Sequence, residues 1–548
     1  MKLHVEKLTG TYADTLKAVG LADLLAEVTG KDVRVRNLGP AYEVEGADPG
    51  PIEEWPIITP GYPYILDSKD KDKPNGWIID YEREKKKAQV AKEFRQAKDK
   101  KRERLEAALR EQGLDAPEGP GLEYRMASFL ASMRKGWSGD KQLYRWIVDN
   151  QDVIKNHVKS ILEHSQCSEP FPEISNSQVF NPTAGKGVHR PKPDSTSPGA
   201  INKAVINGMD EWLKFRGTYA AMLAYRVGDD FKVFVIEPGD IGVNAVRQLR
   251  NGLLGLSLFG GIRLDIDAAL RLLEILILHS DVLGREISLF GRRPSSVIGG
   301  LHQAYFQRLG PASALMNYAF MPLPSWFVVT DHESANAYLK IVKEHAGNKN
   351  RDGEAGCLQV LREDNSGDIP ILKMYREWLL TGEIAALLDF LSRFAVKVME
   401  RRGQKEWVRE FSANGLDDLL ERGYGFVREI IQNEGFRNVA RAVRNATIYA
   451  LSLKNREVRF GLAQEWKQKI KGGDSEFIPA LSDFVQQYNW ESEKIKAHVI
   501  RQEDLDALIG LIEEHGAELV GMLLLAYGYA RAPKIEQEVE KGEINVEA

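Results

Sequence analysis

The sequence predicts an α+β protein, with a mixed α/β N-terminal domain followed by a C-terminal α-helical bundle. Strand-like alternation and many prolines characterise the first eighty residues, for example at 33–36 and 41–44. From Ile371 onward the strand signal largely disappears, and apolar residues recur at helical spacing. A chain of 548 residues is also too long for one compact domain. We therefore expect the mixed domain over residues 1–370, the bundle over 371–531 and a polar tail over 532–548.

Within the mixed domain, the composition changes abruptly at residues 82–111 to Glu, Lys, Arg, Ala and Gln. This composition predicts a long helix, and it is the densest run of charge in the chain. One interpretation is a solvated helix with interspersed acidic residues. The other is a basic rib that lies along a nucleic-acid backbone.

The rest of the mixed domain alternates helical and strand signals. The segments 222–226 and 231–238 predict a hairpin with its turn at Gly228 to Asp230. Further elements are expected as helices at 141–164, 266–279 and 295–309, and as a strand at 326–330.

The bundle is expected to consist of amphipathic helices broken by glycines, namely Gly403, Gly415, Gly423, Gly435 and the Gly472-Gly473 pair. Inside it, Arg437, Arg441 and Arg444 stand at i, i+4 and i+7, so one helix face is expected to present three guanidinium groups. Such a face suits phosphates, although it can equally be solvated. Other cations that could extend it are Arg401, Arg402, Lys405, Lys454, Arg456 and Arg459.

A loop rich in glycine, proline and lysine runs from Asn181 to Asp194. Its three prolines and two glycines are incompatible with a regular helix or a central strand. Gly185 and Gly187 flank Lys186, which leaves backbone N–H groups bare beside an ammonium group. This chemistry predicts a polyanion ligand, either phosphate or a nucleic-acid groove.

A nucleotide-binding P-loop does not fit this segment. That motif needs a glycine where Phe180 stands and a Ser or Thr where Gly187 stands. A surface linker with incidental charge stays an open alternative, because loops collect glycine, proline and charge for turn formation alone.

The overall composition excludes several classes. The net charge is only −5, so any basic surface must be local. The two cysteines belong to no C-x-x-C pair, which argues against zinc ribbons and a disulfide framework. Since no apolar run approaches the roughly 20 residues of a membrane span and charge interrupts the opening residues, we expect a cytoplasmic protein.

The histidines show no H-E-x-x-H motif and no repeated metal-ligand spacing, so neither a metal nor a cofactor is expected. The triplets at 279–281 and 331–333 group acid-base residues, but such triplets arise easily by chance. The chain is therefore expected not to be an enzyme. The alternative is a nucleotide- or phosphate-processing enzyme that uses Lys186 and His189.

The chain resembles the large subunit, or Cas-eight family, of type I CRISPR surveillance complexes (Cascade). The resemblance rests on the loop from Asn181 to Arg190, on the segment from Glu211 to Tyr219 with the strand at 231–238, and on the helical end around Arg437 to Arg444. It covers most of the chain, but its motifs are loose, and the zinc ribbon of some members is missing. It leaves the subtype open.

The resemblance implies an antiviral-defence protein without catalytic activity of its own. Guide RNA reads the target, while this subunit recognises the protospacer-adjacent motif, helps to open the duplex into an R-loop and recruits a helicase-nuclease. The implied partners are the guide RNA, double-stranded target DNA, the backbone subunits and the small subunits.

The resemblance also implies roles for residues of the loop and the bundle. Asn181, Lys186 and His189 would read the motif, and Arg190 and Lys192 would contact phosphates. The glycines would let the protein backbone of the loop approach the DNA groove closely. The arginines Arg437, Arg441 and Arg444 would hold the displaced strand. The implied DNA-binding set is Asn181, Thr183, Gly185, Lys186, Gly187, His189, Arg190, Lys192, Arg437, Arg441 and Arg444.

Some members of this family also make their bundle separately, from an internal start. Met399 is a candidate for such a start here, because it stands near the beginning of the expected bundle.

Overall fold

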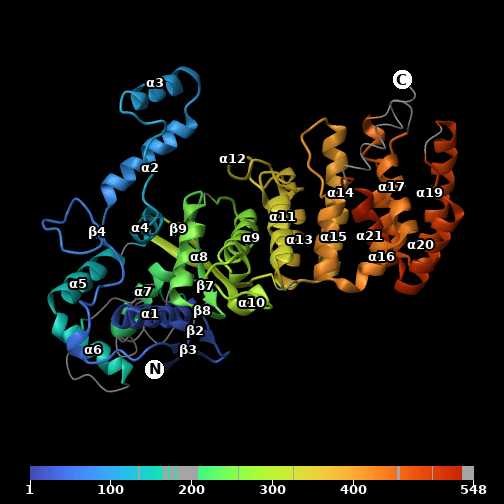
Figure 1. Ribbon diagram of the computed structural model, residues 1–548. Helices are drawn as coiled ribbons and strands as arrows, with labels where there is room; N and C mark the ends of the chain where they lie inside the picture. Colours follow the sequence, from blue (N-terminus) through green and yellow to red (C-terminus); the bar gives the residue numbers. More distant parts are fainter. Residues whose placement is uncertain are drawn as a thin grey trace. The chain divides into compact units, whose positions relative to one another are not determined.

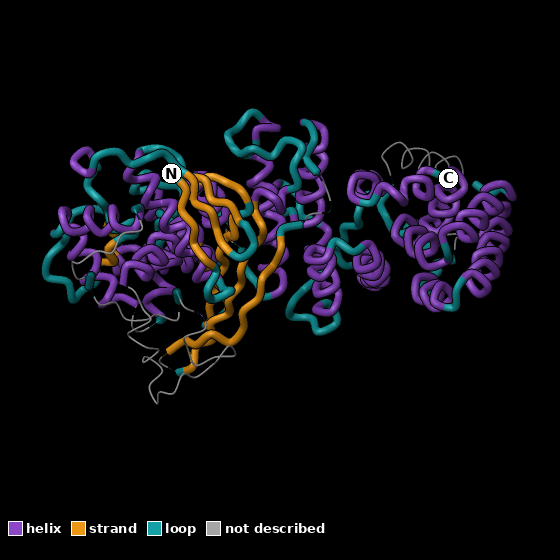
Figure 2. The backbone as a smooth tube through the Cα atoms, turned by 90° about the horizontal axis from the view of Figure 1, so that it is seen from below, coloured by secondary structure: helices purple, strands orange, loops and turns teal. Residues whose placement is uncertain are grey.

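The fold is α+β, with mixed sheets and helices in the N-terminal part and helices alone in the described C-terminal region from Lys349 (Figures 1 and 2). The computed structural model describes residues 1–133, 136–163, 171–172, 179–180, 182, 208–256, 258–310, 312–324, 326, 328–452, 457–495 and 498–532. These form two compact units. Unit 1 comprises residues 1–259, 286–288 and 295–323, and unit 2 comprises 260–285, 289–294 and 324 onward.

Unit 1 contains two four-stranded antiparallel sheets and a parallel pair. The first sheet has the order β1 (Lys2–Glu6), β3 (Ala41–Glu45), β2 (Arg34–Asn37) and β8 (Asp240–Gly242). The second has the order β10 (Ala312–Pro322), β9 (Ile298–Leu309), β7 (Asp230–Pro238) and β6 (Met222–Val227). The parallel pair is β4 (Tyr64–Leu66) with β5 (Ile78–Asp80). The expected hairpin is confirmed as β6 and β7.

Two helices cross closely in unit 1, α1 (Tyr12–Thr29) and α7 (Gly208–Ala221). Thr11 caps α1 by accepting from the Ala13 N–H, and Gly30 ends the helix in the left-handed region with φ 65°. A Cβ atom at Gly20 would overlap the Leu213 carbonyl, and one at Gly217 would overlap the Leu16 carbonyl. These two glycines therefore permit the helix backbones to touch.

The remaining helices of unit 1 are α2 (Tyr81–Gln96), α3 (Asp99–Arg110), α4 (Tyr124–Ser132), α5 (Gly136–Asp149), α6 (Gln151–Leu162) and α8 (Val243–Gly255). The prediction of one long helix over residues 82–111 is wrong in one respect, because the chain breaks between α2 and α3. Ala97 and Lys98 adopt extended conformations, and Asp99 has φ 48°. Ala97 is buried, so tertiary packing overrides the local helix propensity at the break.

Unit 2 is built from helices, apart from isolated bridges, in its described residues. These helices are α9 (Ile262–Leu278), α11 (His332–Ala346), α12 (Lys349–Asp352), α13 (Ile369–Thr381), α14 (Ile384–Gly403), α15 (Ala413–Gly423), α16 (Arg428–Gln432), α17 (Glu434–Ala446), α18 (Leu462–Lys471), α19 (Asp474–Lys494), α20 (Gln502–His515) and α21 (Ala517–Gly528). A short helix, α10 (Pro294–Val297), begins at the junction of the two units. Among the described residues, none of the helices is long and apolar enough to cross a membrane.

The glycines expected to separate helices fall into two groups. Gly403 and Gly423 are the last residues of α14 and α15, and the Gly472-Gly473 pair lies between α18 and α19. Gly415 and Gly435 instead lie inside the first turns of α15 and α17.

Two expected elements of the mixed region are wrong. The segment expected as a helix at 295–309 is almost entirely strand β9, which pairs with β7 on one side and β10 on the other. Pairing on both edges, together with Gly299 and Gly300, outweighs the helical spacing of its apolar residues. In the segment 326–330, the described residues show only an isolated bridge from Val329 to Arg292.

The expected boundary at residue 370 was drawn from composition, and it stays a prediction. Met399 lies near the end of α14 and is buried, with 2% of its surface exposed. A product that started there would lack the preceding residues of α14, including the buried Leu391, Phe394 and Val398. The internal start also stays a prediction.

Candidate nucleic-acid interface

The expected motif-reading loop lies outside the part of the chain that the structure describes. Asn181, Thr183, Gly185, Lys186, Gly187, His189, Arg190 and Lys192 all lie outside the described residues. What the structure describes is the chain on either side of the loop.

The described chain before the loop is tied to the crossing helices of unit 1. Before the loop, the Val179 carbonyl accepts a hydrogen bond of 2.7 Å from the Tyr12 hydroxyl of α1. The ring of Phe180, which is fully buried, lies 4.2 Å from the ring of Phe215 on α7. After the loop, the described chain resumes at Gly208, the first residue of α7. Helix α7 therefore anchors the chain before the loop, whereas residues 195–207, which follow the loop, lie outside the described residues.

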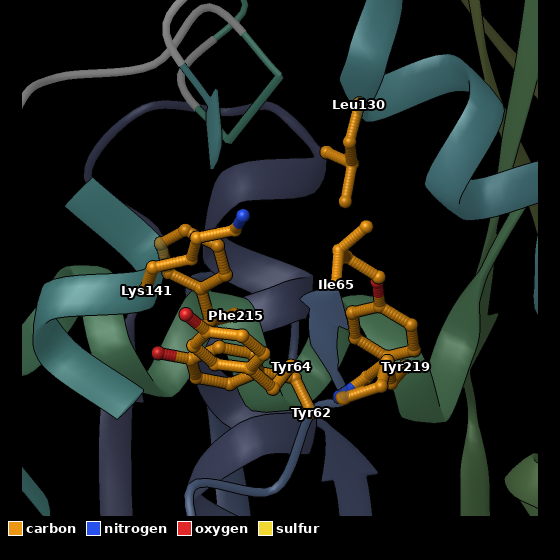
Figure 3. Close-up of a pocket in the computed structure, with 8 residues that line it drawn as sticks. Tyr62, Tyr64, Ile65, Leu130, Lys141, Phe215 and Tyr219 are labelled. Carbon is orange, nitrogen blue, oxygen red and sulfur yellow. The ribbon is translucent and has the colours of Figure 1, made fainter. Parts of the chain in front are cut away.

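The anchoring ring of Phe215 belongs to an aromatic cluster at a small pocket (Figure 3). Tyr62 stacks on Phe215 at 5.0 Å and on Tyr219 at 6.5 Å. The Lys141 ammonium group lies 5.4 Å from the Tyr64 ring and pairs with Asp67 and Asp70, which satisfies its charge. The cavity holds only about 10 Å³, about the limit for a single water molecule. This cluster therefore serves as a packed support and not as a ligand pocket.

The three arginines of α17 are not displayed together. Arg444 is 3% exposed, and its guanidinium group donates to the Tyr527 carbonyl of α21 at 3.2 Å. The reason is its spacing: Arg444 follows the buried Ala440 by four residues and so shares the apolar face of the helix. The expectation of an exposed row of three guanidinium groups is wrong for Arg444.

Arg437 is half-buried and has partners within the bundle. It pairs with Asp417 of α15 at 2.5 Å and lies 4.9 Å over the Tyr527 ring. The Tyr527 hydroxyl donates to the same Asp417 carboxylate at 2.7 Å. Arg441 is likewise half-buried. DNA binding by these three positions stays a prediction, but Arg437 and Arg444 hold α15, α17 and α21 together.

Three of the additional cations expected on that surface have structural partners, whereas Lys405 is exposed just beyond the end of α14. Arg401 pairs with Asp368 at 2.8 Å and with Glu406 at 2.7 Å. Arg402 pairs with Glu410, and Arg459 pairs with Glu491 at 2.8 Å. Lys454 and Arg456 lie outside the described residues.

A buried polar network in unit 1 was not foreseen from the sequence. The Glu237 carboxylate of β7 accepts hydrogen bonds from Thr15 at 2.6 Å and from Tyr42 at 2.6 Å, and it pairs with His302 at 2.8 Å. Burial raises the pKa of Glu237, but hydrogen bonds from His302, Thr15 and Tyr42 and the charge of His302 outweigh it and lower the pKa to about 2. This network joins α1 to both large sheets. Its residues are far apart in the sequence, so no local sequence pattern predicts this network.

A second set of unforeseen charges lines a cleft of about 450 Å³ in unit 1. Arg216 is 2% exposed and pairs with Asp23 at 2.6 Å and with Glu27 at 2.8 Å. Arg247 pairs with the same Asp23. The two carboxylates thus pair with the two guanidinium groups, and an exposed third cation, Lys31, also lines the cleft.

The acid-base triplets have structural roles. Asp331 caps α11 through a capping box with Ser334. The Asp281 carboxylate accepts from the Leu289 and Phe290 backbone N–H groups at 2.8 and 2.9 Å. Among the described residues, His, Cys, Asp and Glu form no group of three or more that could hold a metal ion.

A comparison with models of known protein families finds no match, and a search of curated proteins also finds none.

Proposed function

We propose that the chain is the non-catalytic large subunit of a type I CRISPR RNA-guided surveillance complex. In this function it recognises the protospacer-adjacent motif, helps to open the duplex, holds the non-target strand and recruits the helicase-nuclease. Its partners are guide RNA, double-stranded target DNA, the other backbone subunits and the small subunits, in the cytoplasm.

The observation that carries the proposal is the loop from Asn181 to Asp194 and its attachment. Its glycines and cations suit close approach to a phosphate-lined groove. Phe180 packs on Phe215 of α7 directly before the loop. Such anchoring suits a reading loop, because a recognition residue must be held within a fraction of an ångström of its productive position.

The order of the two regions also supports the proposal. A mixed α+β region followed by an all-helical C-terminal region is the arrangement that the family resemblance implies.

The test is the binding of a target duplex by the assembled complex with Lys186→Ala. We expect a loss of about tenfold or more in affinity for duplexes that carry the adjacent motif, and little change for duplexes without it. Lys373→Ala, at an exposed position of α13, is the matched control and should bind as the unaltered chain does. An equal loss for both classes of duplex would contradict the reading role.

A further inference from the structure

The two charged helices α2 and α3, over Tyr81–Arg110, form an arm that the proposed function does not use. Neither helix contains a buried residue. Residues 82–111 carry twelve Lys and Arg against seven Asp and Glu, a net charge of +5 in a chain whose net charge is −5. The arm is therefore a local positive region on an acidic protein.

The basic residues of α3 share one side of the helix. Lys100, Lys101 and Arg104 are all exposed. At 100° per residue they fall within about 100° of arc, and Lys100 and Arg104 are neighbours one turn apart. Three cations on one exposed face match a row of phosphates, which duplex DNA presents at one charge per about 1.7 Å of its axis.

A stripe of exposed lysine and glutamine residues also runs along one side of α2. Lys85, Gln89, Lys92 and Gln96 stand at i, i+4, i+7 and i+11 and are all exposed. Lysine and glutamine both donate hydrogen bonds to phosphate oxygens without reading a base. The stripe therefore suits contact with a backbone and not recognition of a sequence.

Ion pairs within the arm leave most of its exposed cations able to bind phosphate. The pair from Lys85 to Glu82 measures 4.0 Å, and the pair from Arg102 to Glu106 measures 2.9 Å with both side chains solvated. Lys87 is different, because it is partly buried and pairs with Glu84 at 3.2 Å and with Glu118 at 2.8 Å, so it is not counted among the available cations. Exposed pairs such as the first two stabilise a protein little and are easily exchanged for phosphate.

The arm also lacks the features of a membrane or apolar docking helix. Among the described residues of α2 and α3, Val90 is the one large hydrophobic side chain that is clearly exposed, at 48%. An interfacial membrane helix requires a continuous apolar face. The positive charge of the arm, without an apolar face, therefore favours a polyanion as its ligand over a membrane or an apolar protein surface.

The position of the cations in α3 opposes the stability of the helix. Lys98 stands at the N-cap without a side-chain hydrogen bond, and the first turn holds Lys100 and Lys101 beside one acidic residue, Asp99. The helix dipole is positive at this end, so these cations are unfavourable there. A sequence that breaks a local rule commonly does so where a function requires it.

We propose that the arm over Tyr81–Arg110 binds the phosphodiester backbone of nucleic acid without regard to sequence, through Lys100, Lys101 and Arg104 of α3 and the Lys85 to Gln96 stripe of α2. This inference rests on the proposed function for the identity of the polyanion. It adds a contact that is separate from the motif-reading loop.

The test compares two full-length variants with the same net charge. The arm variant is Lys100→Gln, Lys101→Gln and Arg104→Gln, in which glutamine preserves helix propensity. The control is Lys340→Gln, Lys373→Gln and Lys471→Gln, at exposed lysines of α11, α13 and α18. Fluorescence anisotropy measures binding to a labelled duplex of about 30 base pairs and to a single-stranded RNA of equal length, both of unrelated sequence, between about 50 and 200 mM salt.

We expect the arm variant to bind at least about tenfold more weakly at the lowest salt, with a slope of log K against log salt that is shallower by about 2 to 3. The control should change by less than about threefold. A loss confined to duplex DNA or to RNA would assign the backbone that the arm contacts. Equal losses for the two variants, or no binding by the unaltered chain, would overturn the inference. The proposed function is tested separately by motif dependence at Lys186, so either can fail alone.

Discussion

Helix α17 and the arm formed by α2 and α3 are both rich in cations, yet they use them in opposite ways. In α17, Arg444 is buried against the Tyr527 carbonyl, and Arg437 is paired with Asp417. In α3, Lys100, Lys101 and Arg104 lie in solvent. The difference follows from their surroundings: α17 carries a strong apolar face that packs on α20 and α21, whereas α2 and α3 bury no residue.

The comparison shows that spacing alone does not distinguish a binding face from a structural one. Arginines at i, i+4 and i+7 lie on one side of the helix, but Arg444 lies at the edge of that side which packs with the apolar residues. Burying a guanidinium group requires compensating partners, and here these are carbonyl and carboxylate groups of the same unit. Removal of buried charges should therefore affect stability, and removal of exposed ones should affect binding.

The largest expected effect lies at Glu237 in unit 1. The pKa of its carboxyl group is lowered from the ordinary value of 4.5 to about 2. The ionised carboxylate therefore stabilises the folded protein at pH values above 4.5, and this stabilisation is lost as the pH falls toward 2. The lost stability amounts to about 3 kcal/mol. Chemical unfolding at pH 7 and at pH 2 should show a pH difference that is smaller for Glu237→Gln than for the original chain by about 3 kcal/mol. Other acidic groups with a lowered pKa, such as Asp352, contribute the remaining difference in both chains. Glu53→Gln, at an exposed position, should leave the pH dependence unchanged.

Arg444→Ala should give the next largest loss of stability. It removes a buried charged donor and leaves a cavity next to the Tyr527 carbonyl, at a cost of about 2 to 3 kcal/mol. Thermal unfolding of the full chain should show an earlier transition for unit 2. Arg428→Ala, with a side chain that is 64% exposed, serves as the control and should unfold with the original chain. If the two variants unfolded alike, the structural role of Arg444 would be refuted.

Asp417→Ala should have an intermediate effect on stability, because it removes the one carboxylate that contacts both Arg437 and Tyr527. Both side chains of the ion pair are partly solvated, so the expected loss is about 1 to 2 kcal/mol in urea unfolding. Asp417→Asn keeps an acceptor for the Tyr527 hydroxyl and should lose less. A larger loss for the asparagine variant would contradict this assignment.

The smallest effect is expected in the arm, and its sign is informative. Lys100→Gln with Lys101→Gln removes cations from the positive end of α3, so stability should rise by at most about 0.5 kcal/mol while nucleic-acid binding weakens. Circular dichroism during heating, combined with anisotropy, measures both quantities. A loss of helix together with a loss of binding would show that these lysines act through structure.

The sequence predicted those parts that depend on local pattern. The fold class, the hairpin of β6 and β7 and helix α9 follow from alternation, helical spacing and turn residues. Strand β9 was missed because its pairing with β7 and β10 is not local. The network around Glu237 was missed for the same reason, since Thr15, Tyr42 and His302 come from distant segments. In α17, helical spacing identified the shared sector, but the burial of Arg444 depends on α21.

The most direct test of the proposed function is gentle purification of the tagged chain from its native host, with sequencing of any bound RNA and identification of bound proteins by mass. If the chain has the proposed function, we expect short RNAs of uniform length that share one end derived from a CRISPR repeat, together with the other subunits of the complex. A chain that purifies alone and free of RNA would contradict it.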